Sequence, residues 1–495
     1  MKYIIYIILL VTANCLQLVG QQSDKIWLAG LPYEAGAPGY GNVMIHFEDN
    51  QIEVTQLDLR MNFESTVAVA ADSSDHLLFY TNGCWIANAE GDTMLNGEGL
   101  NPGEMHDWTC SQAGYVTPMG AMALQWPGHP NLYVLIHLGA RYEPEKKLRY
   151  GPLYYTVIDM SLENGKGAVV SKNNVLLDAS LEPFAAVRHG NGRDWWLVVP
   201  KYATNRYYRF LLSPEGLNNA GDQQIGPALT CKQIRPSVFS PDGAHFAKSQ
   251  NCGVCVLDFD RCSGFFANPR LMSWPPHAFG GGGVAFSPNS EVLYATTQMA
   301  ILSADLTAPT PQLDTAVAWN AIAGNSLSLM QYGPDGKLYI GNMGRSSNYH
   351  VFGNLNNPDP ALDFQIQGLA LPVQVVRTLP NYPNFRLLDL AGSACDTLNI
   401  NTSISTHLPF TTAPFIAVSP NPANEAATVT ISGARKGQLT LRSVDGRLMM
   451  QTTFISDAEK SVQVLDLTSY PTGSYFLSLL SEEGGAHSAL INIQR

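Results

Sequence analysis

The sequence predicts an all-β fold, and one repeated pattern is the main reason. The stretch MQYGPDGKLYIGN, residues 330–342, sets a Pro-Asp-Gly turn between two apolar runs. This is typical of a β-hairpin, because Pro presets φ for a turn and Gly accepts a positive φ. The pattern recurs with centres at Asp72, His129, Asn191, Asp242, Asn289 and Asp335. The centres lie roughly 50 residues apart, a spacing typical of β-propeller blades.

We therefore predict a β-propeller of about seven blades over residues 21–398. Each four-stranded blade would bury its two faces against its neighbours in the ring. The six hairpins supply six blades, and LPNYPNFRLLDL, residues 379–390, is assigned to the seventh. The ring is expected to close through a blade shared between residues 42–54 and the end of the domain. An ordinary β-sandwich is the alternative, and the long, even spacing argues against it.

The first twenty residues, MKYIIYIILLVTANCLQLVG, predict a secretory signal peptide, residues 1–20. A retained membrane anchor and a lipoprotein acylated at Cys15 are the alternatives. No later stretch has the apolar length of a transmembrane helix. The net charge of −12 and the lack of a basic block exclude a nucleic-acid partner.

The eight cysteines become seven when Cys15 is removed, and in an exported chain they are expected to form disulfides. Cys84 and Cys110 flank the loop 88–103, so we predict a disulfide between them. A second group contains one C-x2-C pair: Cys231, Cys252, Cys255 and Cys262. Disulfides, buried thiols and a zinc site all remain open for this group.

Candidate ligand-binding residues occur in two loops. His189, Arg193 and Asp194 lie in RHGNGRDWW, residues 188–196, where they would offer a base and a cation beside an aromatic surface. The structural interpretation makes the same residues a turn whose two Trp side chains enter the core. His106 and Asp107 form the second candidate loop, before Cys110.

The sequence predicts no cofactor and leaves the question of a metal open. It contains none of the spacings H-x-H, H-E-x-x-H or G-x-S-x-G. Scattered His residues could still converge on Ca²⁺ or Zn²⁺ at the mouth of a propeller channel.

After Leu398 the composition changes. Residues 399–414 are rich in Ser and Thr and are predicted to form a linker. Residues 415–495 contain short apolar strands separated by turns, which predicts a small β-sandwich.

This tail carries a family resemblance in the motifs VSPNPANEAATV, LRSVDGRLM and VLDLTSYPTGSYFLSL. The distinguishing residues are Pro420, Asn421, Pro422, Asp445, Gly446, Gly473 and Tyr475. The tail resembles the type A C-terminal sorting domain of type IX secretion cargo from the Bacteroidota. The resemblance implies that the outer-membrane secretion machinery is a partner and that the protein passes through the periplasm to the cell surface or the medium. The terminal NIQR lacks the Lys often found in the family, so cleavage of the tail stays open.

The larger region resembles propeller-like proteins found with such tails, a family with no assigned activity. We expect a non-enzymatic exported protein that binds a protein or glycan. The alternative is a metal-assisted hydrolase, lactonase or lyase with its site at the channel mouth. A structural role in the cell envelope is a third hypothesis.

Overall fold

The protein forms two compact units, Met1–Thr402 and Ser403–Arg495, in a computed structural model. The structure describes residues 24–31, 39–48, 51–143, 147–229, 234–250, 252–275, 281–297, 300–318, 327–353, 363–376, 378–398, 415–432, 436–443, 447–455, 460–481 and 486–494. The division falls within the predicted linker, residues 399–414. That linker and the predicted signal peptide both lie outside the described residues.

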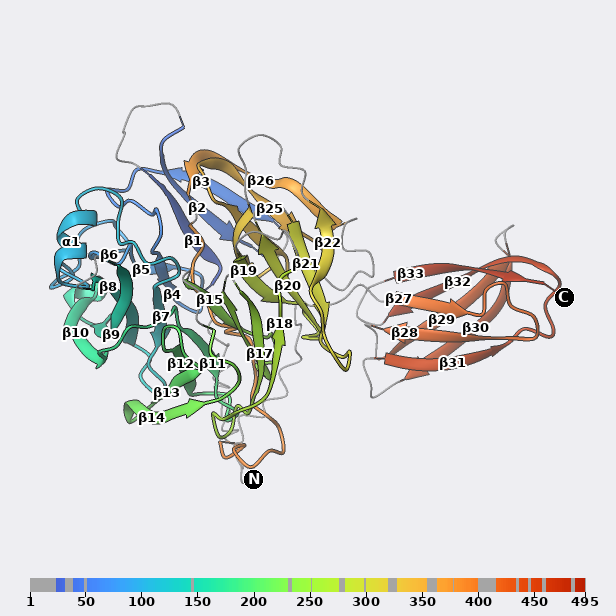
Figure 1. The fold of residues 1–495 in the computed structure, drawn as a ribbon. Helices are drawn as coiled ribbons and strands as arrows, with labels where there is room; N and C mark the ends of the chain where they lie inside the picture. The colour runs from blue at the N-terminus through green and yellow to red at the C-terminus, as the bar shows by residue number, and fades with distance from the viewer. Residues whose placement is uncertain are drawn as a thin grey trace, which may run out of the picture. The chain divides into compact units, whose positions relative to one another are not determined.

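The described part of the first unit contains seven antiparallel sheets of three or four strands, each built from strands consecutive in the chain (Figure 1). The first two are β1 (Ile26–Leu31), β2 (Gly41–Phe47), β3 (Ile52–Leu57) and β4 (Ala68–Ala71), β5 (Leu77–Thr81), β6 (Ile86–Asn88). The third and fourth are β7 (Ala121–Gln125), β8 (Leu132–Tyr142), β9 (Leu148–Asp159), β10 (Ala168–Leu177) and β11 (Ala185–Arg188), β12 (Trp195–Pro200), β13 (Arg206–Ser213), β14 (Gly216–Gln224). The fifth and sixth are β15 (Ile234–Phe239), β16 (His245–Gln250), β17 (Gly253–Phe259), β18 (Phe266–Met272) and β19 (Gly281–Phe286), β20 (Val292–Thr297), β21 (Ala300–Asp305), β22 (Asp314–Ala318). The seventh is β23 (Leu327–Tyr332), β24 (Leu338–Asn342), β25 (Ser346–Phe352) and β26 (Phe364–Val375).

Within the described residues, two short helical elements accompany these sheets. Helix α1 (Glu104–Thr109) follows β6, and the 3-10 helix η2 (Glu163–Gly165) lies between β9 and β10.

All six predicted hairpins are present, and each joins the first and second strands of its sheet. The turn residue explains the repetition. At Asp72, Asn191, Asp242, Asn289 and Asp335, the side-chain Oδ1 accepts a hydrogen bond from the backbone N–H two residues later, at 2.8 to 3.3 Å. Asp and Asn favour turns for this reason, so the same hydrogen bond between side chain and backbone recurs in five of the six hairpins.

The prediction of a strand hairpin at residues 379–390 is wrong. This stretch contains no strand, and the seventh sheet is instead β1–β2–β3 near the N-terminus. Pro380 and Pro383 provide the physical reason, because proline cannot donate to a β-ladder. The predicted shared blade is also not formed, since β26 contacts β1, β2 and β3 without pairing with any of them.

Residues 378–390, which we call the central segment, pass through the middle of the sheets. The first strands of successive sheets contact one another, β1 with β4, β4 with β7, β11 with β15, β15 with β19 and β19 with β23, so these strands line the centre. Tyr382 Oη donates to Ile26 O of the first sheet at 2.8 Å, and Asn384 Nδ2 donates to Pro241 O of the fifth sheet at 2.8 Å. Tyr382 and Asn384 are only two positions apart and contact the first and the fifth sheet. The central segment therefore crosses the centre that the first strands line.

The second unit is a β-sandwich, as predicted. One sheet contains β27 (Phe415–Ser419), β28 (Ala426–Ser432) and β31 (Lys460–Asp466); the other contains β30 (Leu448–Ile455), β29 (Lys436–Ser443), β32 (Gly473–Ser481) and β33 (Ala486–Ile493). Val429 and Ile431 of the first sheet share one buried core with Leu441 and Leu477 of the second. Alternate residues of both sheets therefore face each other, which is the packing of a sandwich.

Candidate functional site

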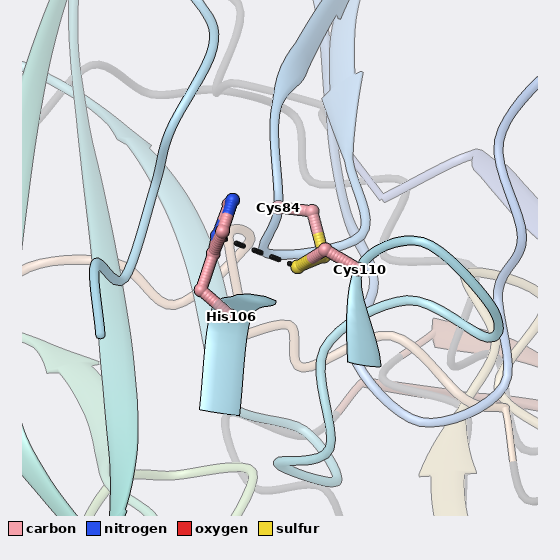
Figure 2. Close-up of side chains that lie close together, drawn as sticks. All are labelled: Cys84, His106 and Cys110. Atoms are coloured by element: carbon pink, nitrogen blue, oxygen red, sulfur yellow. Dashed lines mark hydrogen bonds between the residues drawn. A yellow bond between two sulfur atoms is a disulfide. The ribbon is translucent and has the colours of Figure 1, made fainter. Parts of the chain in front are cut away.

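A depression of about 640 Å³ lies beside helix α1 and is the candidate ligand site. Its lining residues are Arg60, Cys84, Trp85, Thr93, Glu98, Gly99, His106 and Cys110. Cys84 and Cys110 form a disulfide with their Cα atoms 5.6 Å apart, and His106 projects from α1 toward it (Figure 2). His106 Nδ1 lies 3.4 Å from Cys110 Sγ.

The loop between β6 and α1 is held in place by polar contacts to its base. Leu100 N donates to Cys84 O at 2.9 Å, and His106 Nδ1 lies 2.6 Å from Leu100 O. Asn101 Nδ2 donates to Gly83 O at 3.0 Å. The depression is therefore a braced structure, with the disulfide tying its two ends together.

Sequence reasoning missed the support beneath this loop. The imidazole of His137 on β8 is fully buried between Asn101 Oδ1 at 2.7 Å and Thr156 Oγ1 at 2.9 Å. Burial lowers the pKa of His137 to about 3, so the ring is neutral and can donate to only one partner. The two contacts span 55 residues of sequence, and no local motif marks them.

The disulfide decides the chemistry of the three clustered side chains. The ligand atoms of Cys84, His106 and Cys110 lie within 4.8 Å of one another, a spacing suited to a metal ion. Both sulfurs are bonded to each other, however, and only a thiolate is a metal ligand. In this oxidised form the depression offers polar and aromatic contacts instead: the Arg60 guanidinium, the Glu98 carboxylate and the Trp85 indole. Neither Arg60 nor Glu98 is in an ion pair within the described part of the chain.

The structure does not bring the two candidate loops together. His106 and Asp107 lie on α1, whereas His189, Arg193 and Asp194 form the turn between β11 and β12. Asp194 is buried, accepts from Arg193 Nε at 2.7 Å and accepts from Asn191 Nδ2 at 2.8 Å. These contacts match the structural interpretation, in which the residues brace a turn.

The aromatic surface of the ligand-binding interpretation is not formed beside that turn. Trp195 and Trp196 are both buried and point to opposite sides of β12. Trp195 packs against Phe385 of the central segment, with ring centroids 5.6 Å apart. Trp196 Nε1 donates to Arg261 O at 2.8 Å.

The remaining cysteines do not form a zinc site. Cys262 is bonded to Cys395, a partner the sequence interpretation did not assign, and Cys252 is also disulfide-bonded. Cys255 is a free, buried thiol whose pKa burial raises to about 11. Cys231 lies outside the described residues. With two of the four thiols in disulfides, a four-thiolate zinc site cannot form.

The distinguishing residues of the tail that the structure describes lie close to contacts with its last strand. Asn421 Oδ1 accepts from Asn492 N at 2.9 Å, and Ala423 N donates to Asn492 O at 2.8 Å. Tyr475 is buried and pairs with Ile491 across β32 and β33. Pro420, Pro422 and Gly473 flank these contacts, while Asp445 and Gly446 lie outside the described residues.

Residues 417–493 match the family described as the secretion system C-terminal sorting domain. The tail is a sorting domain of type IX secretion. A sorting domain of this kind implies interaction with the type IX machinery and export across the outer membrane, to the cell surface or the medium. None of the curated proteins compared with the chain matches it.

Solved structures similar to this chain include β-propellers. A protein from Lactobacillus plantarum shares 13% identity, with 72% of this chain and 97% of that chain covered and a TM-score of 0.42. A candidate 6-phosphogluconolactonase from Bacteroides uniformis shares 12% identity, with 71% and 98% covered and a TM-score of 0.44. The Cps50 (Swd1) β-propeller domain of Myceliophteria thermophila shares 8% identity, with 61% and 90% covered and a TM-score of 0.36. At these values the likeness concerns the fold and says nothing about activity.

Among the described residues, no helix has the length and apolar character needed to cross a membrane.

Proposed function

We propose that this protein is an exported binding module whose propeller contacts a protein or glycan outside the cell. The sorting domain supports the export step, because domains of its family are the targeting signal that the secretion machinery recognises. The depression beside α1 is the surface we assign to ligand contact.

The observation that carries the binding assignment is the composition of this depression. Trp85 can stack on the apolar face of a sugar or on a peptide side chain, and Glu98 can accept hydrogen bonds from hydroxyl or amide groups. Arg60 adds a cation for carboxylate or sulfate. A rigid loop that presents such groups loses little conformational entropy on binding.

The central segment favours binding over the alternative of a metal-assisted hydrolase, lactonase or lyase at the channel mouth. Thr378, Asn381 and Tyr382 are buried and use their side chains on carbonyl groups of the surrounding chain. Tyr382 and Phe385 belong to the same apolar core as the strands that line the centre. Residues 378–385 thus occupy part of the centre that such a site would need.

The route to the surface is part of the proposal. We expect removal of residues 1–20 on passage into the periplasm, then recognition of the sorting domain at the outer membrane. Intact-mass spectrometry of native protein from culture medium and from washed cells tests this route. A chain that retains residues 1–20 or stays in the periplasm would overturn it.

Ligand contact is tested on glycan and extracellular-matrix protein arrays with the purified full chain. Trp85→Ala and Glu98→Gln are expected to weaken binding of the best ligand by at least tenfold. Phe265→Ala, which removes a half-exposed aromatic side chain just before β18, is the matched control and should bind like the wild type. Equal binding by all four proteins would contradict the assignment of the depression.

A further inference from the structure

A second cluster of ligand-type side chains lies on the β2–β3 hairpin, away from the depression. His46, Glu48 and Glu53 each offer one ligand atom, and these atoms lie within 4.8 Å of one another. The strand pattern explains why they meet. His46 and Glu48 are two residues apart and so point to the same face, and Glu53 pairs directly with His46 across the hairpin.

The imidazole of His46 has a nitrogen whose hydrogen-bonding capacity is unused. Its Nε2 atom is buried and has no hydrogen-bond partner. No ion pair joins His46 to either carboxylate within the described part of the chain. A buried nitrogen left without a partner is costly unless something else satisfies it.

The two carboxylates are held so that each keeps one oxygen available. Gln51 Nε2 donates to Glu48 Oε2 at 2.9 Å, and Thr55 Oγ1 donates to Glu53 Oε1 at 3.2 Å. Within the described part of the chain, Glu48 Oε1 and Glu53 Oε2 accept no hydrogen bond. Hydrogen bonds of this kind orient the ligands of metal sites and are part of their affinity. The two carboxylates also lie side by side without a counter-charge, since no Lys or Arg among the described residues forms an ion pair with either of them.

We propose that His46, Glu48 and Glu53 bind one divalent transition-metal ion of the Zn²⁺, Mn²⁺ or Co²⁺ class. One imidazole nitrogen and two carboxylate oxygens suit these ions, whereas Ca²⁺ and Mg²⁺ take oxygen ligands alone. Ligands at about 2.0 to 2.2 Å from a shared ion lie within about 4.4 Å of each other, so small side-chain rotations bring the three atoms into range. Solvent completes the coordination, because Glu48 and Glu53 are exposed.

This ligand set also suits an exported protein. Among the described cysteines, only buried Cys255 is not in a disulfide, so nitrogen and oxygen are the ligands that the chain can offer. The hairpin consists of the second and third strands of its sheet, whereas the first strands line the centre. The site is therefore separate from the channel-mouth site of the enzyme hypothesis, and it does not depend on the proposed binding function.

The test is a Zn²⁺ titration of the full chain, purified without a polyhistidine tag, in competition with a chromogenic chelator. We expect one tight site per chain, and His46→Gln and Glu53→Gln each to weaken it by at least about tenfold. His76→Gln is the matched control, because His76 also lies in a hairpin beside a carboxylate, Asp72, but is highly exposed. It should leave the tight site unchanged.

A second measurement guards against misfolded variants. Zn²⁺ should raise the melting temperature of the wild type and of His76→Gln but not that of His46→Gln, with all three unfolding cooperatively in its absence. Co²⁺ should give a visible absorption spectrum that requires His46. Wild-type protein without a tight Zn²⁺ site, or a tight site that survives both His46→Gln and Glu53→Gln, would overturn the proposal.

Discussion

Asp24 and Arg386 lie 362 residues apart in the sequence and form a bidentate ion pair. Arg386 Nη1 donates to Asp24 Oδ2 at 2.6 Å, and Nη2 donates to Oδ1 at 3.0 Å. Both side chains are largely buried, Asp24 to 9% exposure and Arg386 to 17%. The pair joins the start of the first sheet to the central segment, so it links the two ends of the propeller chain.

The first prediction concerns this pair. Arg386→Met leaves the Asp24 carboxylate largely buried without its cation, and we expect the propeller to lose about 2 to 3 kcal/mol of unfolding free energy. Urea unfolding followed by tryptophan fluorescence measures this in the full chain, because all eight Trp residues precede residue 403. The double variant Asp24→Asn/Arg386→Met should recover part of the loss. A double variant less stable than the single one would contradict the role of the pair.

The second prediction concerns the disulfide between Cys262 and Cys395, which closes a sequence separation of 133 residues. Cys395→Ser should lower the unfolding free energy of the propeller by about 2 to 4 kcal/mol, because the bond restricts the unfolded chain. The urea midpoint of tryptophan fluorescence reports the change. In the presence of a reducing thiol the wild type and the variant should converge, and a difference that persists would assign the effect to something other than the bond.

How the propeller is held together at its centre could not be predicted from the sequence. The hairpin turns were predictable because an Asp or Asn side chain and its own backbone decide them within three residues. The sequence interpretation assigned the central segment to a seventh blade, but its large apolar residues, Leu379, Tyr382 and Phe385, lie three apart and do not alternate as they would in a strand. The burial of this segment comes from contacts with sheets that are distant in sequence, which no local pattern records.

The candidate site likewise contains a part that the sequence predicts and a part that it does not. The bond between Cys84 and Cys110 was predictable from the loop that the two residues flank. Arg60 and Trp85 were not assigned to the same site, because one precedes the second sheet and the other lies within it. His46, Glu48 and Glu53 share a face through the pairing of β2 with β3, and sequence alone does not fix that register.

The third prediction concerns a buried ion pair between Glu182, just before the fourth sheet, and Lys248 on β16 of the fifth sheet. Lys248 Nζ lies 3.1 Å from Glu182 Oε2, and both side chains are fully buried. Burial raises the pKa of Glu182 above its ordinary value of 4.5, against the effect of Lys248. Lys248→Met removes the opposing cation, so it should raise this pKa further and destabilise the propeller by about 3 to 5 kcal/mol at neutral pH.

The direction of the pH dependence follows from the raised pKa. The folded variant binds a proton at Glu182 more tightly than the unfolded chain does, so a protonated Glu182 favours folding below pH 4.5. This contribution to the unfolding free energy is lost as the pH rises through the pKa of Glu182 in the folded variant. The stability deficit of Lys248→Met should therefore grow as the pH rises above the raised pKa that Glu182 has in the wild type. Glu182→Gln/Lys248→Met, which has no carboxylate at position 182, should lack this loss of unfolding free energy as the pH rises. A deficit in the single variant that shrinks as the pH rises would contradict the argument.

The fourth prediction concerns the last strand of the sorting domain. Asn421 Oδ1 holds the backbone N–H of Asn492 on β33, and this is a contact between a distinguishing residue of the family and the end of the chain. Asn421→Ala removes an interaction of about 1 kcal/mol, so hydrogen exchange at residues 486–494 should accelerate roughly fivefold. Hydrogen–deuterium exchange with mass spectrometry of the full chain measures this. Asn424→Ala is the matched control, because Asn424 is exposed and its side chain makes no hydrogen bond among the described residues.

The same pair of variants connects the strand to export. If the secretion machinery reads the sorting domain in its folded form, Asn421→Ala should lower the amount of protein outside the cell relative to Asn424→Ala, while total synthesis stays equal. Immunoblots of medium, cell surface and periplasm with antibody against the propeller measure the distribution. Faster exchange at β33 together with unchanged export would separate the two properties, and Asn421 would then stabilise the sandwich without contributing to recognition.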